Sequence, residues 1–254
     1  MGRTRGFVIG TLALLAGAAQ AGVIEVDTFH TGGFYGLDDM GMPIAAPDND
    51  MTFQNYFMGR TTVSGFTTPE RRSFFAFDMG GVVPMGEEIV SMSLVLENVF
   101  GGVLANFSGG SETAVFTSTS FGYDAIADPM GSSTPPIAIF DSFGTGDFFG
   151  DIVFDAGGPP DGPVEIVLSP AAIAAAMASG MSGEEFVISG ALATYDPDPM
   201  APFEFVFGLT DVVVGGMPTG FPVPKLVIET APVPSPSGLL VLGGLGIVGA
   251  RRRR

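Results

Sequence analysis

The stretch that decides the fold is Ser73-Phe-Phe-Ala-Phe-Asp78, followed after a turn by Ile89-Val-Ser-Met-Ser-Leu-Val-Leu-Glu-Asn98. Side chains of a strand alternate between its two faces, so Phe75 and Phe77 should face one way and Phe74 and Ala76 the other. In the second segment Val90, Met92, Leu94 and Leu96 fall on one face, whereas Ser91, Ser93 and Val95 fall on the other. This alternation is typical of an antiparallel strand with one face in a core.

Further segments on both sides read as short strands bounded by Gly, Pro, Asp or Asn. They are 23–27, 113–119, 137–140, 150–155, 164–168, 185–189, 191–195, 203–210 and 224–229. In one of them, Phe203, Phe205, Phe207 and Leu209 share a face by the period of two. Pro224 should keep the start of the last strand at an edge or outside the ladder. Residues 123–136 read as a turn-rich connection.

A single helix is expected between Ser169 and Gly180. Ser169 is a good N-cap, Pro170 suits the first helical position, and Gly180 suits the position after the last turn. About ten short strands with one short helix predict an all-β protein, a two-sheet antiparallel β-sandwich that is jelly-roll-like.

The central block carries a resemblance. It is similar to a family of exported bacterial β-sandwich domains with an Arg, an aromatic strand ending in Phe-Asp, a Pro-containing turn and an Ile-x-Ser-Ala-x-Leu-x-Leu strand. The matching residues are Arg72, Phe74, Phe75, Phe77, Asp78, Pro84, Ile89, Ser91, Leu94 and Leu96, with Met92 where Ala is usual. More loosely, the block resembles DNRLRE-type domains and carbohydrate-binding jelly rolls. We expect Arg71 or Arg72 to pair with Glu70 or Asp78 and fix the sheet.

The first 21 residues have the organisation of a secretory signal peptide. Arg3 and Arg5 form a positive start, 7–18 is apolar, and Ala19-Gln-Ala21 is a small-x-small cleavage site that makes Gly22 the mature N-terminus. A first membrane anchor is the alternative, but the apolar run is short for one.

The end of the chain carries a second apolar segment. A Pro234-Ser235-Pro236 motif precedes an uncharged run, and four arginines follow it. The membrane-facing residues would be Gly238, Leu239, Leu240, Val241, Leu242, Leu245, Ile247 and Val248, with Arg251, Arg252, Arg253 and Arg254 held on the cytoplasmic side. The run of 13 residues from 238 to 250 is shorter than the roughly 20 of a stable span, and its glycines weaken a helix. A permanent anchor is the alternative to a transient one.

This tail resembles the PEP-CTERM sorting signal, with Ser235 in place of the usual Glu. The resemblance implies an exosortase-type transpeptidase as partner, transient membrane anchoring, and release to the cell surface or the extracellular polysaccharide. The expected domain organisation is therefore a signal peptide (1–21), a β-sandwich domain (22–230), a linker with the sorting motif (231–237), and an apolar helix with its arginine cluster (238–254).

Composition narrows the function of the middle part. The chain has 10 basic and 27 acidic side chains; six of the arginines lie in the two ends, which leaves four basic residues and a net charge of −23 between them. Such a charge disfavours nucleic acid and anionic lipid as partners. The chain has no cysteine, so the core alone must hold the fold.

Catalytic motifs are missing from the sequence. With no cysteine, one histidine (His30) and no Gly-x-Ser-x-Gly motif, a nucleophilic triad has no basis, and we expect no enzyme and no organic cofactor. His30 itself should be a surface or strand-end residue. A glycosidase with two carboxylates remains as a further alternative, because only their separation reveals such a pair.

Two binding functions remain open. The first is a structural or adhesive matrix protein. The second is a carbohydrate-binding module that uses Tyr35, Tyr56 and Tyr123 as stacking platforms. Calcium could assist through the hard oxygens of Asp38, Asp39, Asp48 and Asp50, but the spacing of an EF-hand is missing and a solvated acidic loop is the preferred explanation of these residues.

Overall fold

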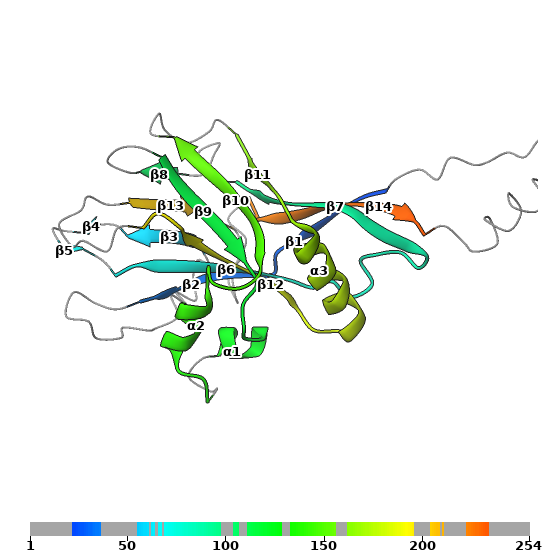
Figure 1. The fold of residues 1–254 in the computed structure, drawn as a ribbon, viewed down its shortest axis with the longest axis horizontal. Helices are drawn as coiled ribbons and strands as arrows, with labels where there is room; N and C mark the ends of the chain where they lie inside the picture. The colour runs from blue at the N-terminus through cyan, green and yellow to red at the C-terminus, as the bar shows by residue number, and fades with distance from the viewer. Residues whose placement is uncertain are drawn as a thin grey trace, which may run out of the picture.

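The computed structural model describes residues 22–36, 55–60, 62–63, 66–67, 69–97, 104–106, 111–128, 133–155, 162–195, 204–208, 210 and 222–233. The chain is an all-β protein built from antiparallel sheets, as predicted (Figure 1). The smaller of the two main sheets has four strands in the order β1 (Gly22–Asp27), β14 (Lys225–Pro232), β7 (Glu87–Leu96) and β11 (Val164–Val167).

The larger sheet is centred on β6 (Arg71–Phe77), half of the stretch that decides the fold. Its path is β10 (Phe148–Asp155), β9 (Ser111–Thr117), β12 (Phe186–Leu192), β6, β3 (Tyr56–Arg60), β13 (Glu204–Gly208) and β8 (Leu104–Asn106). Strand β2 (His30–Tyr35) also pairs with β6. A separate hairpin joins β4 (Thr62–Val63) to β5 (Phe66–Thr67).

The alternation predicted for β6 is confirmed, and both of its faces are buried. Phe75 and Phe77 belong to the main core between the two sheets, together with Met92, Leu94 and Leu96 of β7. Phe74 and Ala76 point to the opposite face, where a second core forms with α1 (Tyr123–Ala127) and α2 (Pro136–Ser142). Figure 1 shows these two helices together beside β2 and β6. The phenylalanines on the two faces of β6 thus belong to different cores, and this explains why the strand has no polar face.

Two predictions for the helices need correction. Residues 137–140 form part of α2 and not a strand, because Pro135 and Pro136 set up a helix start and four apolar residues have no period of their own. Helix α3 (Pro170–Ser182) has the predicted cap, since the Ala172 amide donates to Ser169 Oγ over 3.4 Å. It continues past Gly180 and ends at Gly183, whose φ of 75° is the left-handed conformation that glycine adopts readily.

Two predictions for the strands also need correction. Val90 is 49% exposed, because the pairing of β14 with β7 shifts register between Glu229 and Thr230 and so turns Val90 out and Ile89 in. The two strands expected at 185–189 and 191–195 are one strand, β12. In β13, Val206 faces the main core and Phe205 points the other way and stacks on Phe57 with ring centroids 5.4 Å apart, which agrees with the expected alternation at these two positions.

The first and last strands of the domain lie side by side. Gly22 pairs with Thr230, and the strand β14 lies between β1 and β7, so Pro224 precedes a central strand and lies just outside its ladder. The Val233 amide donates to the Gly86 carbonyl over 2.8 Å just beyond β14. Among the helices that the structure describes, none combines the length and the hydropathy of a membrane span.

Candidate functional site

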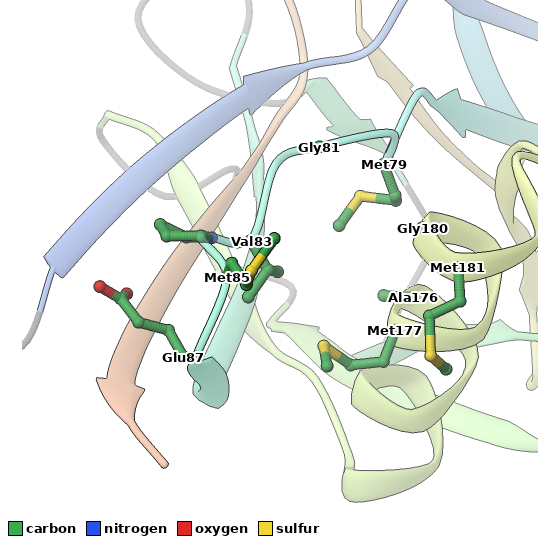
Figure 2. A pocket seen from close by; sticks show the side chains of 11 residues that line it. Met79, Gly81, Val83, Met85, Glu87, Ala176, Met177, Gly180 and Met181 are labelled. Carbon is green, nitrogen blue, oxygen red and sulfur yellow. The ribbon is translucent and has the colours of Figure 1, made fainter.

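An apolar groove lies between α3 and the 79–87 segment that connects β6 to β7. We call it the methionine groove; its volume is about 420 Å³, and it is lined by Met79, Gly81, Val83, Pro84, Met85, Gly86, Glu87, Ala176, Met177, Gly180 and Met181. Figure 2 shows Met79 and Met177 extending into the space between the loop and the helix, with Val83 and Met85 on the other side. Met85 is fully exposed and Met181 is 80% exposed. An open hollow of this kind suits an apolar ligand or segment.

Gly180 explains how the walls of the groove come together. A Cβ at this position would lie 2.9 Å from the Met79 carbonyl oxygen, so glycine allows α3 to approach the loop closely. The sequence pointed to Gly180 as a helix stop; its role is instead this close approach within the helix.

A second, polar hollow surrounds Tyr123 at the start of α1. We call it the Tyr123 hollow; its volume is about 320 Å³, and Gly122, Tyr123, Asp124, Glu184 and Glu185 line it. Burial first, and then the charges of Glu185 and Asp124, raise the pKa of the Tyr123 hydroxyl, so it stays protonated at neutral pH. The ring of Phe29, which is 41% exposed, meets the Tyr123 ring edge-on at 5.1 Å. An aromatic pair beside carboxylates can stack on a sugar ring and accept hydrogen bonds from its hydroxyls.

His30 lies behind this hollow at the start of β2, so it is the expected strand-end residue and not a surface residue. Only 6% of it is exposed, because it begins β2 under Phe74 and Tyr123. His30 Nδ1 lies 2.7 Å from the Tyr123 hydroxyl, and its buried Nε2 has no hydrogen-bond partner among the described residues. Burial lowers the pKa of the imidazole to about 4, so the ring is neutral at pH 7. The neutral histidine fixes the orientation of the Tyr123 ring.

The other two tyrosines predicted as stacking platforms serve the fold. Tyr56 is fully buried, and its hydroxyl donates to the Glu97 carbonyl over 2.7 Å. Tyr56 is buried because it lies on the core side of β3. The sequence around it does not reveal which side of the strand faces the core. Tyr35 ends β2 and is covered by the guanidinium of Arg71, 4.1 Å from the ring centre. The structure therefore does not bring the three tyrosines together.

Arg72, which directly precedes the fold-deciding stretch, forms one of the expected ion pairs. Arg72 pairs with Glu70 over 2.7 Å, and it also donates to the Phe143 carbonyl over 2.9 Å and lies over the Phe140 ring. Arg72 thus fastens α2 to β6. Asp78 instead accepts a hydrogen bond from the Gly80 amide and shapes the turn after β6.

A cluster of buried charged residues on β3, β9 and β13 was missed by the sequence analysis. Arg60 and Glu204 face each other across the β3–β13 ladder, and both are buried. Arg60 lies over the Tyr195 ring, and Glu112 accepts a hydrogen bond from Thr194. Burial raises the pKa of the Glu112 carboxyl, and the charge of Glu204 adds to this. The only indication in the sequence was that each of these strands carries a charged residue among apolar ones. A charged residue at such a position is buried with the strand and needs a partner.

Several predicted sites lie outside the described residues. They are the acidic positions Asp38, Asp39, Asp48 and Asp50, the cleavage residues Ala19 and Ala21, the Pro234-Ser235-Pro236 motif and the apolar segment with its arginines. Within the described part of the chain, no three His, Asp or Glu side chains converge as metal ligands, those of the Tyr123 hollow included.

No protein-family model matches the chain, and no curated protein matches it.

Proposed function

We propose that this chain is an exported protein that is processed at both ends and kept at the cell surface or in the extracellular polysaccharide as a structural or adhesive component. The observation that supports this proposal is where the fold begins and ends. Strand β1 starts at Gly22, directly after the expected cleavage site, and β14 ends at Pro232, two positions before Pro234 of the sorting motif. Cleavage at either place would leave every hydrogen bond of the small sheet intact.

The net charge and the hydrophobic cores of the domain are compatible with a role as an exported surface component. The domain carries a net charge of −23 once the terminal arginines are set aside, which favours solubility and repels anionic surfaces. Two hydrophobic cores hold it without any disulfide, so its folding does not depend on an oxidising compartment.

The test is the mature form of the native protein. Intact mass and N-terminal sequencing of protein recovered from the cell surface should show a chain that begins at Gly22 and lacks the apolar tail. Replacing Pro234 and Pro236 by Ala should leave the tail uncut and the protein membrane-bound, whereas the neighbouring Ser237→Ala change should have no effect. A native chain that still begins at Met1 and stays in the cytosol would contradict the proposal.

Carbohydrate binding at the Tyr123 hollow is a second candidate, supported by its aromatic pair and three carboxylates. A glycan array run with and without calcium tests it. Tyr123→Ala should abolish any signal, and Tyr35→Ala is the matched control because Tyr35 lies at the other end of β2 under Arg71. Equal binding by both variants, or none by the unmodified protein, would exclude this role.

A further inference from the structure

Among the residues that line the methionine groove, Glu87 at its edge is the one charged residue. Neither residues 79–86 nor α3 contains Asp, Glu, Lys or Arg, and Met85 and Met181 stand exposed at its mouth. Methionine side chains are flexible and polarizable, so such a surface adapts to irregular apolar partners. The groove is therefore suited to a segment rich in Leu, Val and Ile.

The chain leaves the domain at the rim of this groove. Gly86 lines the groove, and its carbonyl accepts the hydrogen bond from the Val233 amide. Gly238, the first residue of the apolar run, follows five positions later, a span of at most about 17 Å for an extended chain. Figure 2 shows β14 running past Glu87 on the loop side of the groove. The apolar run thus begins within reach of the groove.

The charges around the groove match those of the tail. Acidic residues flank both walls, with Glu87 and Glu88 after the loop and Glu184 and Glu185 after α3. The tail has the complementary order, an uncharged run followed by Arg251 to Arg254. When the apolar run lies in the groove, the arginines can reach an acidic rim.

We propose that the methionine groove is the docking site for the 238–250 segment of the same chain. Covalent attachment at the rim gives this segment a high effective concentration, so docking requires little intrinsic affinity. The docked state shields the apolar run from water, and a membrane or a processing enzyme must compete with the groove for it. This inference goes beyond the proposed function, because it requires only an intact tail and neither export nor cleavage.

Methionine oxidation resolved by mass spectrometry tests the inference on three chains in detergent-free buffer: the full chain, a chain that ends at Ser237, and a chain that lacks residues 2–21. Hydrogen peroxide should oxidise Met85 and Met181 about fivefold more slowly in the full chain than in the chain ending at Ser237, because the docked segment covers them. The chain without 2–21 should keep this protection. Loss of protection there would show that the N-terminal apolar segment fills the groove, and would overturn the inference.

A charge placed in the groove gives a second test. Met181→Glu should restore rapid oxidation of Met85 in the full chain, whereas Val167→Glu, an equally exposed change on β11, should not. Since the chain has no cysteine, a Met181→Cys and Leu242→Cys pair can also be oxidised selectively. A disulfide within the monomer supports docking in the same chain. A disulfide found only in dimers, or equal oxidation of Met85 with and without the tail, would overturn it.

Discussion

His30 Nδ1 and the Tyr123 hydroxyl lie 2.7 Å apart, and this contact joins the start of β2 to the start of α1. The neutral imidazole is buried at the base of an aromatic cluster, where a proton would be poorly solvated. Protonation and folding are therefore coupled through this residue.

The coupling predicts that the protein loses stability as the pH falls. The pKa of His30 is about 4 in the folded state and near 6.5 in the unfolded chain. The unfolded chain therefore binds a proton first, and the contribution of His30 is fully present above pH 6.5 and is lost between pH 6.5 and 4. Urea denaturation at pH 7.5 and 4.5 should show a fall on the order of 2 kcal/mol that is missing in His30→Asn. The raised pKa of Glu112 acts in the opposite direction but is common to both chains, so an equal fall in the variant would refute the assignment.

Gly208 should be intolerant of any side chain. A Cβ at this position would lie 1.8 Å from Cζ of the buried Tyr56 ring, which cannot move aside within the core. We expect Gly208→Ala to cost about 3 kcal/mol or more in free energy of unfolding. Gly122→Ala is the matched control, because nothing lies within 4 Å of its Cβ and its φ of −69° suits alanine. Similar melting temperatures for the two variants would contradict the packing at Tyr56.

Ser169 should contribute to stability beyond an ordinary helix cap. Its Oγ accepts from the Ala172 amide and donates to the Phe148 carbonyl over 2.7 Å, so it ties α3 to β10. Ser169→Ala should cost about 1–2 kcal/mol in chemical denaturation. Ser182→Ala, at the exposed end of the same helix, should cost less than about 0.5 kcal/mol. Equal effects at both ends would mean that the Phe148 contact contributes nothing.

Arg72 should contribute more to the stability of the fold than the exposed Lys225–Glu25 ion pair of the small sheet. Arg72→Ala removes the bond to Glu70, two bonds to α2 carbonyls and the contact with the Phe140 ring, and should cost about 2–3 kcal/mol. Lys225→Ala breaks the exposed pair with Glu25 and should cost less than about 1 kcal/mol. Thermal denaturation of the two variants measures the difference, and a reversed order would exclude Arg72 as the fastening of α2.

The sequence was informative where a single period governs the chain. The alternation in 73–78 and in the second half of 89–98 predicted both the strands and their faces, because each face of the first strand meets a core and one face of the second meets the main core. The exposure of Val90 was not predicted because the register shift is set by Glu229 and Thr230 of the partner strand β14, which are 139 and 140 positions further along the chain. The helix at 136–142 was not predicted because four apolar residues suit a strand and a helix equally, and the helix start at Pro135 and Pro136 together with packing against Phe34 and Phe74 decides between them.

The candidate sites depended still more on tertiary contacts. Tyr123 was named from its residue type alone, and its carboxylate neighbours Glu184 and Glu185 come from a distant segment after α3. The methionine groove could not be foreseen, since its walls are two uninterrupted apolar segments that each resemble core. Glu204 and Arg60 were hidden because pairing across β3 and β13 links positions 144 residues apart.

The adjacency of Gly22 and Thr230 also sets how the domain is presented. A tether at either terminus holds the molecule at the same end of the paired strands β1 and β14, so attachment through the N-terminus or the C-terminus would give the same orientation. Joining Pro232 to Gly22 by a short linker, with new termini opened at the exposed turn around Gly81, should therefore give a circularly permuted protein that still folds.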